Sequence, residues 1–226
     1  MCSIIGSFSK DKLLELVKLN SSRGEFSHSL TTIDPNTLEC NTIKNFGSFN
    51  EELLQHVSES DYLLAHNQAP TGGLIKDEGR IHPAVIGDLS LWHNGMLKSK
   101  EIKRLNTKYC TYIQWDTMLM LQSITEDGII PSLRNMDGSF ACVLIEEFKS
   151  FKIFRNQSSP LYIDDNMNIS SRGFEGSKML AMNYMYNGNF AKRCFERQDH
   201  FLNKNAPYFF TDEDSGILDG PPRSNT

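Results

Sequence analysis

The chain has 226 residues and a formal net charge of −5, with 39% hydrophobic and 23% charged residues. This balance is ordinary for a globular protein, and the length suits one domain with a substantial core. The negative charge gives no global attraction to nucleic acid or anionic lipid, and no apolar run approaches the roughly 18 residues of a membrane span. We therefore expect a single domain that binds neither nucleic acid nor membrane.

The cysteines and the N-terminus favour a reducing compartment. The first residues lack the basic segment and the long apolar stretch of a signal peptide. Five cysteines are spread along the chain without the close pairs that mark zinc or redox sites: Cys2, Cys40, Cys110, Cys142 and Cys194. We expect a cytoplasmic protein without a metal site or a cofactor.

Hydrophobic spacing predicts a mixed α+β fold. In chain order, we expect a strand at residues 3–8, a helix at 11–19, a helix that Asn50 caps, and a strand at 62–66. There follow a strand at 87–93, a helix at 98–105, a helix that begins at Asp116, and strands at 139–146, 151–155 and 168–171. Strands that neighbour one another in sequence are usually antiparallel, so antiparallel sheets are predicted.

Residues 67–83 show neither the spacing of a helix nor that of a strand, because glycine and proline recur there among polar side chains. A loop of this length is uncommon in a compact domain unless it binds something, so we expect it to form one wall of a binding site; a surface insertion is the alternative. From residue 212 the chain is polar and rich in chain breakers. The sequence thus predicts a domain at residues 2–211 and a loosely held tail at 212–226.

Cys2 follows the initiator methionine directly. Removal of Met1 would give this residue both a thiol and a free α-amine. An α-amine has a pKa near 7.7–8.0, so a useful fraction is neutral near pH 7 and can accept the proton of the attacking thiol. Cys2 is therefore a candidate nucleophile that carries its own base. A small residue at an ordinary N-terminus is the alternative.

Several segments in order strengthen the first interpretation. They are Met1-Cys2-Ser3-Ile4-Ile5-Gly6, Arg23-Gly24-Glu25-Phe26-Ser27, His66-Asn67-Gln68-Ala69-Pro70-Thr71-Gly72-Gly73, His82-Pro83 and His93-Asn94-Gly95. Together they resemble the class II glutamine amidotransferases, the N-terminal-nucleophile family that includes the glutaminase domains of glucosamine-phosphate synthase, asparagine synthetase and amidophosphoribosyltransferase. The resemblance spans residues 2 to about 190. It implies a four-layer αββα sandwich with two antiparallel sheets.

The resemblance also implies roles for individual residues. The Asn94 side-chain amide and the Gly95 backbone N–H would form the oxyanion hole, Asp116 would pair with the α-ammonium group of substrate glutamine, and Thr71 and His93 would line the pocket. Two alternatives stay open. Asn-Gly is the commonest dipeptide of tight hairpin turns, and an Asp at the start of a helix is commonly a cap.

One position departs from the family pattern. The loop normally offers an arginine that binds the α-carboxylate of glutamine, and Gln68 stands there instead. Charge-assisted hydrogen bonds contribute about 1.5–3 kcal/mol and neutral ones about 0.5–1.5 kcal/mol, so carboxylate binding would weaken roughly tenfold to a hundredfold. Arg80 on the same loop is a candidate replacement, and a solvated surface arginine is the alternative.

The implied function is that of a glutaminase subunit. Cys2 would attack the side-chain amide of L-glutamine and form a thioester, and the released ammonia would pass to a separate synthetase or transferase, because little sequence follows residue 190. Two further hypotheses stay open. The chain is an N-terminal-cysteine amidase acting on another amide, or a weakly catalytic module of this fold that binds a small amide or a partner.

Overall fold

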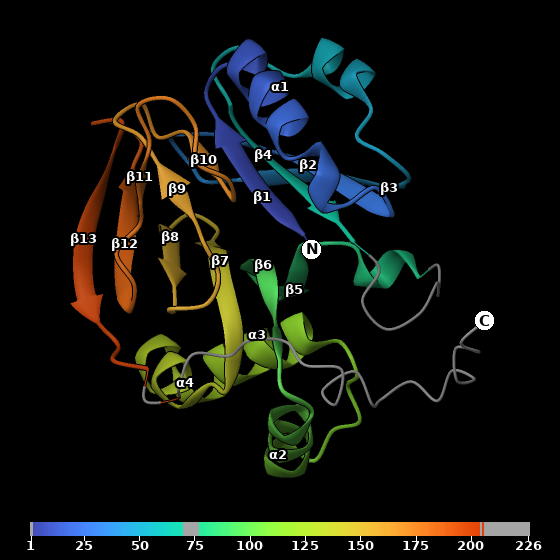
Figure 1. Ribbon diagram of the computed structural model, residues 1–226, viewed down its shortest axis with the longest axis vertical. Coiled ribbons are helices and arrows are strands. Elements are labelled where there is room, and N and C mark those ends of the chain that lie inside the picture. Colours follow the sequence, from blue (N-terminus) through green and yellow to red (C-terminus); the bar gives the residue numbers. More distant parts are fainter. Residues whose placement is uncertain (1, 70–76, 204, 206–226) are drawn as a thin grey trace, which may run out of the picture.

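Two β-sheets stack face to face in the computed structural model, which describes residues 2–69, 77–203 and 205 (Figure 1). The seven-stranded sheet has the spatial order β11 (Lys178–Met179), β9 (Tyr162–Ile163), β10 (Ile169–Ser170), β1 (Ser3–Ser7), β4 (Tyr62–Gln68), β2 (Ser27–Ile33) and β3 (Cys40–Phe46). The six-stranded sheet has the order β13 (Cys194–His200), β12 (Tyr184–Asn189), β8 (Ser150–Arg155), β7 (Gly138–Glu146), β6 (Leu89–Leu97) and β5 (Ala84–Ile86). Neighbouring strands are antiparallel, as predicted.

Helices cover the outer face of each sheet and complete the predicted αββα sandwich (Figure 1). Helix α1 (Lys10–Leu19) lies on the seven-stranded sheet. On the six-stranded sheet lies α3 (Asp116–Asp127), against which α2 (Ser99–Tyr109) and α4 (Ile129–Asn135) pack. Short 3₁₀ helices are η1 (Ser21–Arg23), η2 (Glu51–His56) and η3 (Glu78–Arg80). Within the described residues, none of these helices is both long and apolar enough to cross a bilayer.

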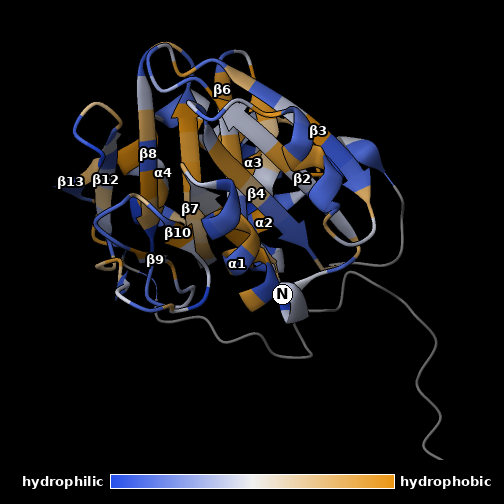
Figure 2. Ribbon diagram, turned by 90° about the horizontal axis from the view of Figure 1, so that it is seen from above, coloured by the Kyte–Doolittle hydropathy of each residue, from blue (hydrophilic) through white to orange (hydrophobic). Residues whose placement is uncertain are grey.

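The layers follow from the alternation of side chains along the central strands. In β1, Ile4 packs between the sheets while Ile5 packs under α1. In β6, Trp92 packs between the sheets while Leu91 faces α3 and its neighbours. Strand β7, which is buried on both faces, is therefore apolar almost throughout (Figure 2), whereas the edge strand β3 is largely hydrophilic.

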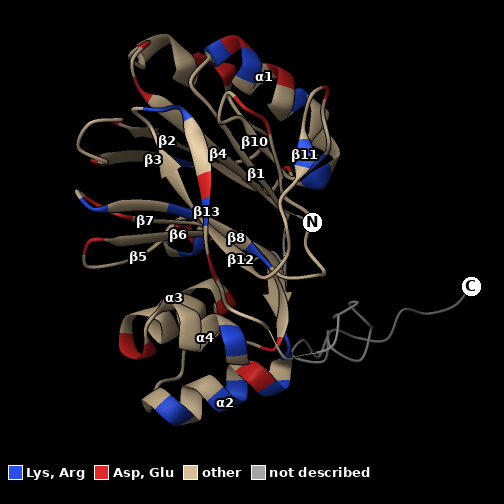
Figure 3. Ribbon diagram, turned by 90° about the vertical axis from the view of Figure 1, so that its left-hand side faces the viewer, with Lys and Arg blue, Asp and Glu red and all other residues tan. Residues whose placement is uncertain are grey.

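Charged residues lie mainly on helices such as α1 and α2 and toward the ends of strands (Figure 3). Local capping supports the same elements. The Ser9 hydroxyl accepts a hydrogen bond from the backbone N–H of Lys12 at the start of α1 (3.2 Å), and Asn50 accepts one from Glu52 (3.0 Å) at the start of η2. Asn50 thus caps a helix as predicted, but the helix is of the 3₁₀ type.

Two sequence predictions need correction. The strand predicted to end at residue 93 continues to Leu97, and Asn94-Gly95 lies inside it, paired with Ala141 and Phe140 of β7, so the hairpin-turn alternative is wrong. Strands β2 and β3, which form a hairpin at one edge of their sheet, were not predicted. The tail predicted at 212–226 lies outside the described residues and stays a prediction.

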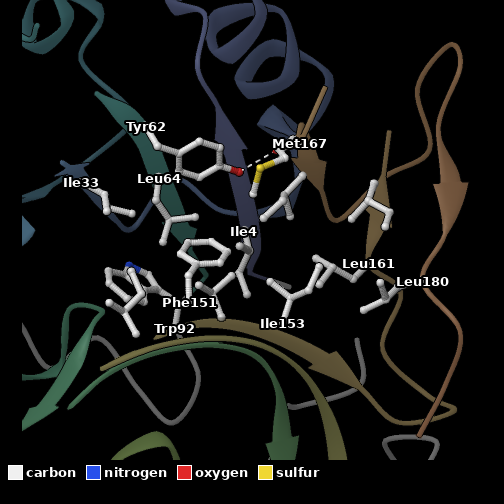
Figure 4. Close-up of a cluster of buried hydrophobic side chains, with 14 of the residues drawn as sticks. Ile4, Ile33, Tyr62, Leu64, Trp92, Phe151, Ile153, Leu161, Met167 and Leu180 are labelled. Atoms are coloured by element: carbon white, nitrogen blue, oxygen red, sulfur yellow. Dashed lines mark hydrogen bonds between the residues drawn. The ribbon is translucent and has the colours of Figure 1, made fainter. Parts of the chain in front are cut away.

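The core between the sheets contains one buried hydrogen bond that fixes a loop. Tyr62 is fully buried, and its hydroxyl donates to the backbone carbonyl of Met167 across 2.8 Å (Figure 4). A buried carbonyl that loses its donor typically costs about 1–3 kcal/mol.

We predict that Tyr62→Phe lowers the free energy of unfolding by about 1–3 kcal/mol, because the Met167 carbonyl is left unpaired. Urea denaturation with an unchanged m-value measures this loss. The matched control is Tyr112→Phe, whose side chain is 98% exposed and should change stability by less than about 0.5 kcal/mol. Equal stabilities of the two variants would contradict the prediction.

Candidate active site

Cys2 lies at the end of the central strand of its sheet, where the two sheets face each other. It directly precedes β1, whose start lies beside β6 of the other sheet (Figure 1). Side chains alternate along a strand, so Cys2 faces the same way as Ile4, toward the second sheet. The thiol is buried, with 8% of the residue exposed.

Asn94 of β6 meets Cys2 from the other sheet. The Cys2 carbonyl can only accept a hydrogen bond and the Arg23 guanidinium can only donate, which fixes the orientation of the amide. The Asn94 nitrogen donates to the Cys2 carbonyl (3.0 Å), and the Asn94 oxygen accepts from Arg23 Nη2 (3.2 Å) and Ser171 Oγ (3.1 Å). One amide hydrogen is used in this way, and the second is left for another acceptor near Cys2.

The Arg23-Gly24 segment supports the same corner of the site. Arg23 Nε donates to the Cys2 carbonyl across 2.9 Å, beside the Asn94 amide. A β-carbon on Gly24 would lie 2.5 Å from the carbonyl carbon of Gln68 and 2.6 Å from the backbone nitrogen of Ala69. Glycine is therefore needed for the segment after η1 to pack against the end of β4.

Gly95 occupies a position that admits no side chain. Its φ is +152°, and a β-carbon there would lie 2.0 Å from the Ser139 carbonyl oxygen. Phe140, which is paired with Gly95, uses its own backbone N–H and carbonyl on Asn156 (3.1 and 3.0 Å). The Gly95 N–H therefore points away from β7, toward the other side of β6. On that side β5 pairs only with residues 89–91, so it does not reach Gly95.

His93 points to the opposite face of β6 from Asn94, toward α3. Its Nε2 lies 3.1 Å from the Ser139 carbonyl, and its Nδ1 lies 3.2 Å from the Thr117 hydroxyl. Asp116 lies close by, with 4.0 Å between its Oδ2 and His93 Nδ1. The Asp116 carboxylate also accepts the backbone N–H groups of Leu97 (3.2 Å) and Thr117 (2.8 Å), so it ties the start of α3 to the end of β6.

Two further histidines stack against this cluster. The rings of His66 and His82 lie 3.9 Å apart, and His82 Nε2 lies 3.1 Å from the same Thr117 hydroxyl. Burial lowers the pKa of His66 to about 3, with a partly opposing hydrogen bond to the His93 carbonyl. Burial also lowers the pKa of His82 well below its ordinary value. Both rings are therefore neutral near pH 7.

Gln68 is engaged with groups of the chain itself. Its side-chain oxygen lies 3.3 Å from both the Ser27 hydroxyl and His82 Nδ1, and its nitrogen donates to the Arg80 carbonyl (3.2 Å). The Arg80 guanidinium pairs with Asp77, with 3.3 Å between Nε and Oδ2. It lines a surface depression of about 460 Å³. Thr71 lies outside the described residues.

The depression adjoins the histidine cluster and leaves Cys2 and Asn94 outside its lining. Trp115 forms part of its wall, and the Trp115 ring makes an edge-to-face contact with His82 at 5.3 Å. In the described part of the chain, no three His, Cys, Asp or Glu side chains are arranged to hold a metal ion.

The environment of the thiol keeps it protonated at rest. Burial raises the pKa of Cys2 above its ordinary value, the backbone N–H of Ala69 opposes this by a hydrogen bond, and the charge of Asp116 adds to the increase. A nucleophilic attack by Cys2 would therefore need a base that accepts the thiol proton during the reaction.

Comparisons with known proteins show the fold. A solved glutamine phosphoribosylpyrophosphate amidotransferase from B. subtilis superposes with a TM-score of 0.63 at 14% identity, covering 89% of this chain and 49% of that one. An allosteric regulatory enzyme of purine biosynthesis superposes with a TM-score of 0.65 at 16% identity, with the same coverages. The chain has the N-terminal-nucleophile amidotransferase fold.

The match to these structures confirms the family resemblance at the level of the fold. The chain spans about half the length of the solved structures it matches. No protein-family model and no curated protein matches the sequence.

The structure brings together most, but not all, of the residues singled out in the sequence. Cys2 and Asn94 meet directly, and Gly95 is adjacent, while His93 and Asp116 lie on the α3 side of β6. Arg80 is partly exposed and paired with Asp77. The sequence analysis did not identify Ser171, Thr117 or the contact of Arg23 with Cys2. Arg23 lies in one of the motif segments, Ser171 lies in the strand predicted at 168–171, and Thr117 follows Asp116, but none of these positions indicated the contacts that the structure shows.

We predict that Gly95→Ala lowers the free energy of unfolding by about 1–3 kcal/mol, because the added methyl group overlaps the Ser139 carbonyl and forces β6 and β7 apart. Chemical denaturation measures the loss. A variant as stable as the wild type would show that the strand accommodates a side chain and would remove the steric argument for glycine.

We also predict that stability falls as the pH is lowered from about 6.5 toward 3. His66 has an ordinary pKa of 6.5 when unfolded and about 3 when folded, so the unfolded state binds more protons in this window. The slope from His66 alone is roughly 1.4 kcal/mol per pH unit.

Urea denaturation between pH 4.5 and 7.5 tests the His66 prediction, with His66→Gln as the comparison. Glutamine can still donate to the His93 carbonyl but does not titrate, so the variant should show a shallower decline. Identical slopes in both proteins would contradict the assignment to His66.

Proposed function

We propose that the chain is a glutaminase of the class II amidotransferase type, with Cys2 as its nucleophile after removal of Met1. The observation that carries this proposal is the contact between Cys2 and Asn94, in which the amide nitrogen lies 3.0 Å from the Cys2 carbonyl. This contact brings a thiol and a directed amide donor together where the central strands of two sheets face each other. The fold shared with the amidotransferases supports the same proposal.

The proposed reaction starts with transfer of the Cys2 thiol proton to the α-amine of the same residue. The thiolate attacks the side-chain carbonyl carbon of L-glutamine, and the oxyanion accepts hydrogen bonds from the Asn94 amide and the Gly95 N–H. The α-ammonium group returns its proton to the leaving nitrogen, so ammonia departs and a thioester remains. Water then attacks the thioester, which releases glutamate and restores the thiol.

The remaining site residues are proposed to hold the amino-acid end of the substrate. Asp116 supplies a carboxylate for the α-ammonium group, and its charge is close enough to Cys2 to raise the pKa of the thiol. Gln68 is proposed to position the same end of the substrate, and Arg80 is the proposed source of positive charge for the α-carboxylate. Thr71 is proposed to line the pocket, and His93 supports the pocket from the opposite face of β6.

We further propose that ammonia passes to a separate synthetase or transferase, and that the protein acts in the cytoplasm. The chain spans about half the length of the solved structures that share this fold. A reducing compartment suits a nucleophilic thiol, and the five cysteines are free.

The decisive experiment combines mass and activity. Intact mass should show loss of Met1, and the purified protein should release ammonia from glutamine and be labelled once, at Cys2, by a glutamine-mimicking diazoketone. Cys2→Ala should abolish both, because removal of a covalent nucleophile typically costs several orders of magnitude in kcat. Cys110→Ala is the matched control, since this exposed thiol lies outside the site.

The same assay separates the alternatives. Turnover of another primary amide that still requires Cys2, without activity on glutamine, would identify the amidase. Thermal stabilisation by glutamine without turnover or labelling would identify the binding module. Retained Met1 in the active protein would contradict the proposed nucleophile altogether.

A further inference from the structure

Ser171 is a fully buried hydroxyl that the proposed chemistry does not yet use. It directly follows β10, and 1% of the residue is exposed. The backbone pairing between β10 and β1 ends at Ser170 opposite Ile5. At the next position the Ser171 hydroxyl takes over, because its Oγ accepts the backbone N–H of Ile4 across 2.9 Å. Ser171 is therefore anchored to the strand that carries Cys2.

The single hydroxyl hydrogen of Ser171 has two acceptors within reach. The Asn94 oxygen lies 3.1 Å from Oγ, whereas the Ile4 carbonyl lies 3.5 Å away. The shorter contact has the better hydrogen-bond distance, so the hydroxyl donates to Asn94. A continuous path then runs from the backbone of β1, through Ser171, to the amide of Asn94.

This contact is one of three that set which end of the Asn94 amide faces the nucleophile. The oxygen and nitrogen of an Asn side chain have nearly the same size, so rotation by half a turn exchanges them without a steric penalty. An oxyanion hole needs the nitrogen on the side of Cys2. Ser171 and Arg23 both present donors to the oxygen, and the Cys2 carbonyl presents an acceptor to the nitrogen, so all three partners favour one orientation.

We propose that Ser171 is a positioning residue for the reaction at Cys2, which holds the Asn94 amide with its nitrogen directed toward the oxyanion. This inference rests on the proposed glutaminase function. It assigns Ser171 no contact with substrate; the residue acts through Asn94.

The first test compares Ser171→Ala with Ser170→Ala. Ser170 is also a fully buried serine, but its hydroxyl accepts from Asn20 Nδ2 (2.9 Å) and from the backbone of Arg172 (3.1 Å), away from Asn94. Loss of the neutral hydrogen bond to Asn94 predicts that Ser171→Ala lowers kcat about threefold to tenfold with KM nearly unchanged. Ser170→Ala should keep the wild-type kcat. Equal effects of the two substitutions would overturn the proposal.

A double-mutant cycle with Asn94→Ala separates positioning of the amide from support of β1. If Ser171 acts through Asn94, the double variant Ser171→Ala with Asn94→Ala should have the same kcat as Asn94→Ala alone. Loss of an oxyanion-hole donor typically lowers kcat by about 10²–10³, and we expect this for Asn94→Ala. If Ser171 instead acts by holding Ile4 and Cys2, its loss of activity should persist in the Asn94→Ala background. That persistence would overturn the proposal.

The unfolding equilibrium keeps this test distinct from the test of the proposed function. A wild type without activity on glutamine would reject the glutaminase, but the hydrogen bond can still be judged by urea denaturation of the wild type, the three single variants and the two double variants with Asn94→Ala. We expect Ser171→Ala and Asn94→Ala to be coupled by at least about threefold in the unfolding constant. Ser170→Ala and Asn94→Ala should be additive. Additivity of the Ser171 pair would show that the amide is not held by this hydroxyl.

Discussion

The hydrogen bond between the Asn94 amide and the Cys2 carbonyl joins the two sheets at the point where each offers a chemical group. Its existence depends on strand register, because a slip of one residue would turn either side chain to the other face. Core packing sets this register. Burial of Ile4 between the sheets turns Cys2 inward, and burial of Trp92 between the sheets turns Asn94 inward. The same packing that stabilises the sandwich therefore brings the candidate nucleophile to its donor.

The strand that carries Asn94 is held from its other face as well. His93 links β6 to the Ser139 carbonyl of β7 and to Thr117 of α3, and Asp116 accepts the Leu97 N–H at the end of the strand. His82 is buried beside Thr117, and burial of a charged ring there would be costly, so the ring must stay neutral. Such a rigid surround suits a donor that must be aimed before any negative charge develops.

The sequence predicted the elements with strong local patterns and missed those without. Strand β1, helix α1 and the start of α3 follow from apolar spacing, and the order of the short motifs indicated the sandwich. Strand β2 could not be predicted from apolar spacing, because its buried positions include Ser27, Ser29 and Thr31. These polar residues hide the pattern of a buried strand. Ser171 and Thr117 could not be assigned at all, since their partners lie tens of residues away in the sequence.

Gln68 shows how a position in a motif can acquire a different use. The Gln68 amide oxygen contacts the Ser27 hydroxyl and the His82 ring, and its nitrogen donates to the Arg80 carbonyl. This set of contacts requires a side chain with both an acceptor and a donor. An arginine has donors only, and it would place a charge beside the buried, neutral His82. The glutamine therefore suits the described surroundings better than the family's arginine would. If the substrate carries an α-carboxylate, the positive charge that pairs with it must come from a residue other than Gln68, and that requirement separates a glutaminase from an amidase with a different substrate.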